Sequence, residues 1–265
     1  MTKLIVTCAV ISILAAAQVQ ARGVPMPSPA PQVQAVECAF KSGFRFGLEG
    51  GYRHQKTKEK IEFNASALVA PFGFVNETRS KKPHKDTGVV GAHVAYDFFF
   101  SRIYSSLELD YRYGWGTNKA KLQFSNQPAG DVPETFHMKR KQPHDFAINL
   151  HAGPQLGDCF LVYGILSARW GRFKDKVQVR NQPAAPNAVS KSKNQTRFGY
   201  GFGLGGRYLL PNQFSVSLEG TFDTYKSGKT LNLTSPDLAI LGSSIKAKFG
   251  HTHNFNLILK ASKNF

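Results

Sequence analysis

Two histidines near the end of the chain, His251 and His253, have the spacing that most suggests chemistry. A hydrolytic site needs a nucleophile beside a general base, and a serine two residues after a histidine would fit that need. Here the residue two positions after His251 is His253, and Phe255 stands two positions further on. A His-x-His pair is a minimal chelator, short of the three or four protein ligands of a metal site. We therefore predict no catalytic residue, no metal site and no cofactor.

Charged side chains form a second pattern, because they recur at alternate positions of otherwise apolar segments. Six are basic and six are acidic: Arg45, Glu49, Arg53, Asp97, Glu108, Asp110, Arg112, Arg169, Arg207, Glu219, Asp223 and Lys260. Alternate residues of a strand lie on one face, so these charges would face away from the apolar side chains. Balanced charges that meet in a narrow interior pair with each other. We predict an interior ion-pair network, with His93 and His151 in the same polar packing.

The segments that carry this pattern are predicted to be strands, because apolar and polar residues alternate with period two. They cover residues 44–53, 90–98, 103–115, 146–152, 162–170, 198–208, 214–223 and 245–265. Long connections alternate with short ones, which is typical of a transmembrane barrel with an even number of strands. We predict an all-β fold: an eight-stranded antiparallel up-and-down transmembrane β-barrel with long loops on one side and short turns on the other. Residues 61–63 and 122–124 are interpreted as hairpin extensions above the membrane.

Aromatic residues decide which face meets lipid, since a soluble lipocalin-like carrier would point its apolar face inward. They collect at the long-loop ends (Tyr52, Tyr113 and Trp115, with Trp170 and Tyr225 nearby) and at the turn ends (Phe98, Phe99, Phe214 and Phe265). Two such girdles are typical of a membrane protein. The apolar faces are therefore predicted to meet lipid, including Ile245, Ala247, Phe249, Phe255, Leu257, Leu259, Ala261 and Phe265 in the last strand.

The N-terminus is predicted to be an export signal. A lysine precedes an apolar run that ends in Val19-Gln20-Ala21, which suits cleavage after residue 21. The predicted divisions are a signal peptide at 1–21, a Pro-rich extension at 22–41 and the barrel at 42–265. Cys38 and Cys159 would both lie on the periplasmic side, where a disulfide can form. Whether they pair is left open.

The alternating strands, the export signal and the terminal Phe265 resemble the small outer-membrane β-barrels of Gram-negative bacteria. The pattern is similar to that of opacity-type proteins and of the transmembrane domain of outer-membrane protein A. The resemblance implies location in the bacterial outer membrane. It also implies that the last strand, with Phe255, Leu257, Leu259 and Phe265, is the signal read by the barrel-assembly machinery. Lys263 departs from the apolar alternation of that signal.

The net charge of +17 indicates the kind of partner. Nearly all of it belongs to residues 55–87, 117–144, 172–197 and 226–251, at the end of the long loops. Such loops suit the phosphates of lipopolysaccharide, or an acidic glycan or host surface. Aromatic residues are sparse in them, so nucleic-acid binding is not predicted. We expect a structural or surface-interaction (adhesin-like) role without catalysis. The alternatives are a small channel and a lipid A-modifying enzyme.

Overall fold

The computed structural model describes residues 40–65, 75–124, 134–180, 190–233 and 244–265. They belong to one compact unit, Glu37–Phe265. The predicted signal peptide and most of the Pro-rich extension, including Cys38, lie outside the described residues. No helix in the described part of the chain is long and apolar enough to cross a membrane.

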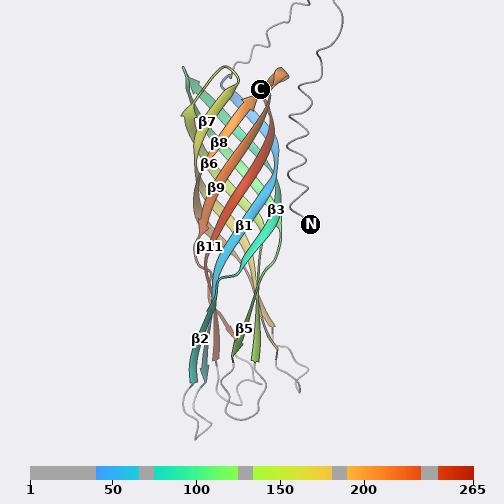
Figure 1. The fold of residues 1–265 in the computed structure, drawn as a ribbon, viewed down its shortest axis with the longest axis vertical. Helices are drawn as coiled ribbons and strands as arrows, with labels where there is room; N and C mark the ends of the chain where they lie inside the picture. The colour runs from blue at the N-terminus through green and yellow to red at the C-terminus, as the bar shows by residue number, and fades with distance from the viewer. Residues whose placement is uncertain (1–39, 66–74, 125–133, 181–189, 234–243) are drawn as a thin grey trace, which may run out of the picture. The chain divides into compact units, whose positions relative to one another are not determined.

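The described chain is almost entirely antiparallel strand, as predicted. The strands are β1 (Gly43–Ala65), β2 (Val75–Lys81), β3 (His84–Phe100), β4 (Ile103–Trp115), β5 (Asn118–Phe124), β6 (Glu134–Pro154), β7 (Phe160–Arg180), β8 (Ser190–Leu209), β9 (Phe214–Tyr225), β10 (Leu231–Leu233) and β11 (Ser244–Asn264). Eight of them close a ring in the order β1-β3-β4-β6-β7-β8-β9-β11, and β11 pairs back with β1 (Figure 1). The predicted eight-stranded up-and-down barrel is confirmed.

Short turns close one end of this barrel. β3 turns into β4 through Ser101, which has φ of 57°. β8 turns into β9 through a 3-10 turn, Pro211–Gln213, in which Asn212 has φ of 60°. The long connections all leave from the opposite end, as predicted. In transmembrane barrels of this topology the short turns are periplasmic, so the end where the long connections leave is expected to face the cell exterior.

The two faces of the barrel wall divide the side chains by polarity. Outward-facing residues are apolar and exposed, with Leu48 71% and Leu204 70% accessible. Inward-facing residues are charged or polar and buried, because the backbone alternation places them in a narrow lumen. Glycines of β8 leave room in that lumen for large side chains of the neighbouring strands. A Cβ at Gly205 would lie 2.7 Å from the ring of Tyr163, so glycine there gives the tyrosine its space.

Beyond the ring, the strands continue as two separate four-stranded sheets. One has the order β2-β1-β11-β10 and the other β5-β6-β7-β8. Figure 1 shows β2 and β5 at this end, opposite the C-terminus. Within the described strands no backbone ladder joins β2 to β5 or β8 to β10. The predicted hairpin extensions at 61–63 and 122–124 lie in β1 and β5.

An apolar core fills the space between the two sheets. Its members come from both sheets and are almost completely buried: Ile61, Ala120, Leu122, Phe136, Met138, Val177, Leu231, Leu233, Ile245, Ala247 and Phe249. The polarity of this extension is therefore opposite to that of the barrel. Its inside is apolar and its outside carries lysines, as in a soluble β-sandwich.

On β11 and β6 a β-bulge contributes to this reversal, and the bulge of β11 corrects one prediction. On β11 the register shifts at Gly250-His251, where two residues oppose the single residue Lys58 of β1. A bulge moves every following side chain to the other face. Hence Ile245, Ala247 and Phe249 point inward and not to lipid. A second bulge at Gln142-Pro143 does the same for β6. A bulge tolerates proline because the residue there does not donate a ladder hydrogen bond.

Two aromatic residues assigned to the girdles also face inward. Tyr225 is fully buried and donates a hydrogen bond to Asp145 at 2.7 Å. Phe99 stacks on Phe40 at a centroid distance of 5.5 Å and packs against the interior cluster of Tyr104 and its neighbours at the turn end. Both sit one position out of phase with the lipid-facing residues of their strands.

Candidate functional site

The twelve charged residues singled out in the sequence all lie buried inside the barrel. At the turn end, Asp97 accepts from two arginines, Arg45 at 3.2 Å and Arg207 at 2.6 Å. Arg45 also reaches Glu108 at 3.1 Å, and the guanidinium of Arg207 stacks on Tyr104 at 4.6 Å. These contacts join four strands of the ring across the lumen.

Lys260 is the centre of the next layer. Its ammonium group donates to Glu108 and, at 2.8 Å, to Glu219, and Glu49 lies 3.7 Å away. Glu49 is also bound by Arg112 at 2.6 Å. One lysine therefore faces three carboxylates from three different strands.

The third layer lies closer to the cell exterior and is built around Asp145. This carboxylate pairs with Arg53 at 3.1 Å and with Arg169 at 2.9 Å. Arg169 extends the contact to Asp223 at 3.4 Å. The network thus continues without a break in side-chain pairing from the turn end to the outer rim.

Sequence reasoning missed a fourth layer, at the base of the extension. Arg140 pairs with Asp175 at 2.8 Å, and Arg197 donates to the same carboxylate. Glu59 is fully buried, and neither of its carboxylate oxygens has a hydrogen-bond partner among the described residues. The segments that contain these four residues are predicted to be loops, because their outward lysines hide the apolar alternation. Asp145 was missed for a simpler reason: it immediately precedes the apolar run of its strand.

One group of side chains within the described chain could in principle hold a metal ion: Glu108, His151 and Glu219. The ammonium of Lys260 lies among these groups and hydrogen-bonds to both carboxylates. A fixed positive charge at that position repels a second cation. The arrangement therefore fits an internal ion pair better than a metal centre. His93, the other histidine predicted in the polar packing, is buried and lies 2.9 Å from the hydroxyl of Ser262.

The histidine pair that first suggested chemistry lies on the outer face. His251 and His253 are both exposed. Nδ1 of His253 is 3.1 Å from the hydroxyl of Thr224, and its ring stacks on Phe222 at 5.9 Å. A hydroxyl beside an imidazole could act as a nucleophile and base, but a third group is needed to orient the base. No carboxylate is among the described contacts of His253.

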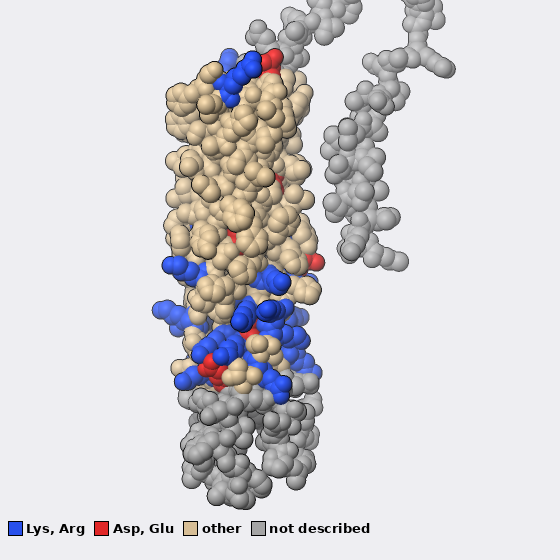
Figure 2. Space-filling view, turned by 60° about the vertical axis from the view of Figure 1, so that its left-hand side comes forward, with Lys and Arg blue, Asp and Glu red and all other residues tan. Residues whose placement is uncertain are grey.

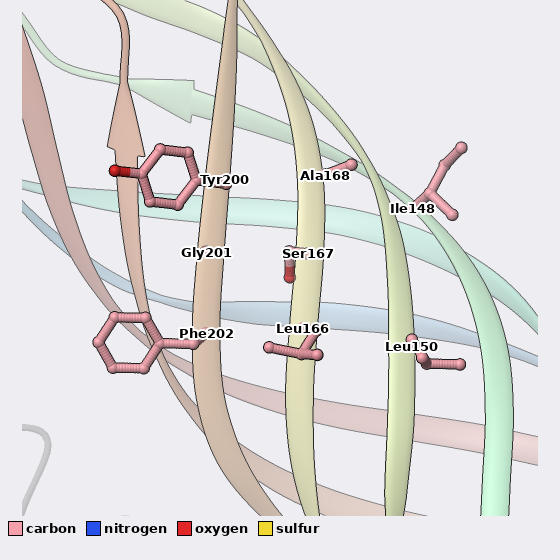
Figure 3. Close-up of a pocket in the computed structure, with 8 residues that line it drawn as sticks. All are labelled: Ile148, Leu150, Leu166, Ser167, Ala168, Tyr200, Gly201 and Phe202. Carbon is pink, nitrogen blue, oxygen red and sulfur yellow. The ribbon is translucent and has the colours of Figure 1, made fainter.

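The lipid-facing wall contains the predicted assembly signal and one shallow hollow. Phe255, Leu257, Leu259 and Phe265 are outward-facing and between 45% and 69% exposed. The hollow, about 410 Å³, lies over β6, β7 and β8. Figure 3 shows Tyr200 and Phe202 on one side of it, Ile148 and Leu150 on the other, and Ala168 between them. Its apolar lining suits a lipid chain.

Cys159 lies in the periplasmic turn between β6 and β7 and is disulfide-bonded. The chain has three cysteines. The other two, Cys8 and Cys38, lie outside the described residues.

A basic collar surrounds the extension, directly beyond the aromatic rim. We use this name for the exposed residues Lys56, Lys58, Lys81, Lys82, Lys85, Lys119, Lys121, Lys141, Arg172, Lys174, Lys191, Lys193, Lys226, Lys229, Lys246 and Lys248. On the face that Figure 2 shows, Lys and Arg side chains gather in a band beyond the mostly uncharged barrel wall. The acidic side chains among them are few, chiefly Glu62 and Asp86.

A polar, ion-paired lumen inside an apolar wall defines a transmembrane β-barrel. The sequence agrees, because residues 6–257 match the family model of the outer membrane protein beta-barrel domain. The chain belongs to this family, and its location is the bacterial outer membrane.

Two solved structures illustrate the similarity of fold. The outer membrane protease OmpT of Escherichia coli is 11% identical, with 86% of this chain and 99% of that chain covered and a TM-score of 0.48. Ail, the attachment invasion locus protein of Yersinia pestis, is 12% identical, with 84% and 99% covered and a TM-score of 0.28. No protein with a curated description is significantly similar in sequence.

Proposed function

We propose that this outer-membrane barrel is a surface-interaction protein of the adhesin type, which binds an acidic partner through its basic collar. The observation that carries the proposal is the separation of charge. Charges inside the membrane-spanning part are buried and paired, as Lys260 is with its three carboxylates. Most charges of the collar are exposed lysines with few acidic neighbours.

The collar is positioned to act at a surface. Lys58, Lys174 and Lys246 project outward from strands whose inner faces form the apolar core of the extension. The strands hold these lysines in fixed positions, whereas lysines on a free loop would lose more entropy on binding. A concentrated positive field of this kind raises the association rate of anionic partners.

The alternative of a small channel is less well supported by the interior. The series Arg207, Asp97, Arg45, Glu108, Lys260 and Glu219 links side chains of six strands across the lumen. Above it, the apolar core of the extension fills the space between the two sheets. A conducting path would require both sets of contacts to open. Single-channel recording in planar bilayers tests this alternative directly.

The alternative of a lipid A-modifying enzyme depends on His253 and Thr224. The described contacts of His253 are the Thr224 hydroxyl and the Phe222 ring, which leave the imidazole without an acidic partner. We propose that the pair belongs to the aromatic rim. The mass spectrum of lipid A from cells that express the protein, compared with Thr224→Val, tests this. A mass change that the variant abolishes would establish the enzyme.

Assembly and the N-terminal extension complete the proposal. The outward row from Phe255 to Phe265 would be the strand that the assembly machinery reads. The disulfide of Cys159 would tie the chain before β1 to the base of the barrel, with Cys38 as the partner. Peptide mapping without reduction would identify the cysteine bound to Cys159.

The binding proposal is tested with the full-length chain purified in detergent micelles. Immobilised heparin serves as the acidic probe at low salt. We expect retention that weakens steeply with added salt, because exposed charges are screened over about 10 Å at 0.1 M. The control is a variant with four collar lysines changed to glutamine. Equal elution of wild type and this variant would refute a role of the collar.

A further inference from the structure

The two sheets of the extension leave a gap at one edge, and this gap is built differently from the rest of the collar. β9 ends at Tyr225, and from Phe198 toward Ser190 β8 is paired on one side only, with β7. The segment 226–230 crosses the gap without forming a ladder. Three hydrogen bonds span it: Lys226 N to Phe198 O at 3.0 Å, Lys229 N to Gln195 Oε1 at 3.0 Å, and Lys191 Nζ to Asn232 O at 2.8 Å.

A hollow of about 430 Å³ lies at this gap. Its lining comes from residues 193–198 of β8 and from Lys226, Ser227 and Lys229. The volume falls within the range of small-ligand sites, and three lysines stand around it. Phe198 adds one aromatic wall and belongs to the membrane rim, where it packs on Trp170 at 5.6 Å. The hollow is therefore close to the outer boundary of the lipid.

Arg197 makes this hollow more than a group of surface lysines. It lines the hollow but is only 4% exposed. Its guanidinium donates to Asp175 and lies over the ring of Phe173 at 4.5 Å. Within the described residues, Nε and Nη1 of Arg197 have no hydrogen-bond partner. Buried guanidinium donors without acceptors are costly, so the hollow is lined by a cation whose charge is only partly matched by hydrogen bonds.

The acidic groups near Arg197 do not balance the positive charge. Asp175 is shared between Arg197 and Arg140. Glu59 is buried close enough to both arginines to interact electrostatically, and burial raises the pKa of its carboxyl group to about 7. The two carboxylates are thus matched by the two arginines, and the three lysines of the hollow add further positive charge. The local excess of positive charge persists even when Glu59 is ionised.

A close backbone approach fixes the arginine in this place. A Cβ at Gly228 would lie 2.1 Å from Nη2 of Arg197. The crossing segment therefore lies directly against the guanidinium, and a side chain at residue 228 would require the end of Arg197 to move. This contact gives the hollow a defined floor.

We propose that the gap between β8 and residues 226–230 is a binding site for a phosphate or sulfate ester carried on a saccharide. The site deepens the proposed surface-interaction function and rests on it. Lys193, Lys226 and Lys229 would contact the anionic oxygens, above the floor that Arg197 forms. A lipopolysaccharide headgroup and a sulfated glycan share this chemistry.

The test compares two double variants of equal charge. Lys193→Ala with Lys229→Ala removes two lysines of the hollow, and Lys119→Ala with Lys121→Ala removes two exposed lysines from β5. Both are made in the full chain, and a heat-modifiable gel band verifies that each variant folds. Affinity for a labelled heparin tetrasaccharide and for lipopolysaccharide, with and without its phosphates, is measured at about 0.15 M salt, where charges beyond about 8 Å are screened.

We expect the hollow variant to lose about tenfold or more in affinity for at least one probe, and the β5 control to lose less than about threefold. Loss toward heparin assigns the site to a sulfated glycan. Loss toward phosphorylated lipopolysaccharide alone assigns it to a lipid headgroup. Equal losses in both variants would overturn the site while leaving the collar function intact. Absence of binding by the wild-type protein would overturn both.

Discussion

Replacement of Lys260 by methionine is the sharpest test of the interior network. Methionine keeps most of the length and volume of lysine but removes the charge, so three buried carboxylates lose a shared cation. At an effective dielectric constant of about 20, charges at the 2.8 Å and 3.7 Å separations from Glu219 and Glu49 attract by about 4–6 kcal/mol each. Desolvation of the lysine offsets much of this attraction. Removal of one partner from a buried ion pair costs about 3–5 kcal/mol net, which is the loss of stability we expect.

The measurement is urea-induced unfolding of the barrel in phospholipid vesicles, followed by tryptophan fluorescence and by the heat-modifiable gel band. Lys248→Met on the same strand is the matched control, because Lys248 forms an exposed ion pair with Glu62 and such pairs contribute about 0–1 kcal/mol. Adding Glu219→Gln to Lys260→Met should restore part of the stability, since one unpaired carboxylate is then neutral. A loss below about 1 kcal/mol for Lys260→Met, or no coupling in the double-mutant cycle, would refute this account of the interior.

Three further outcomes are expected. Glu59→Gln should flatten the pH dependence of stability. The pKa of Glu59 is about 7 in the folded protein and about 4.5 in the unfolded chain, so between these values the folded state retains a proton that the unfolded state has lost. Stability therefore falls by about 3 kcal/mol as pH rises through that window. Urea unfolding at pH 5 and pH 8 measures this difference. Deletion of His251 should remove the bulge of β11 and turn Phe249 outward. Limited proteolysis should then cut the extension while the heat-modifiable barrel persists. Unchanged protection against the protease would contradict the role of the bulge. Deletion of Phe265 should lower recovery in the outer-membrane fraction without changing the stability of the barrel that does fold, and undiminished recovery would remove the terminal residue from the assembly signal.

The membrane-spanning part of the fold could be predicted from the sequence because lipid and lumen impose opposite demands on alternate residues. Residues such as Leu48 and Glu49 obey a strict period of two, and a single register explains the whole segment. The topology, most of the faces and twelve of the interior charges follow from that pattern, whereas Asp145 and the inward faces of Phe99 and Tyr225 were missed.

The extension could not be predicted in the same way. Its strands have polar outer faces, so Lys58 and Lys174 resemble loop residues when viewed along the sequence. The bulge at Gly250-His251 adds one residue to β11 and inverts the phase of Ile245–Phe249 relative to the rest of the strand. The sequence alone contains no clear mark of that insertion, because the odd-numbered residues remain apolar on both sides of it.

The ion-pair partners inside the barrel could be predicted only in part, for a related reason. Alternation places Arg53 and Arg169 in the lumen, but it does not say that both converge on Asp145. That convergence depends on the stagger of strands around the ring. Pairing of this kind is a property of the closed barrel and not of any one strand.

The length of the extension sets the height at which the connecting segments begin. β1 continues for eight residues beyond Thr57, to Ala65, which corresponds to at most about 26 Å of extended strand. The two packed sheets of the extension act as a stalk, so the chain at residue 65 leaves from the end of the stalk and not from the barrel rim. The collar lies on the sides of this stalk, so a partner that binds the collar approaches it from the side of the extension. Shortening the paired strands of the stalk would lower the contact surface without changing a residue of the connecting segments.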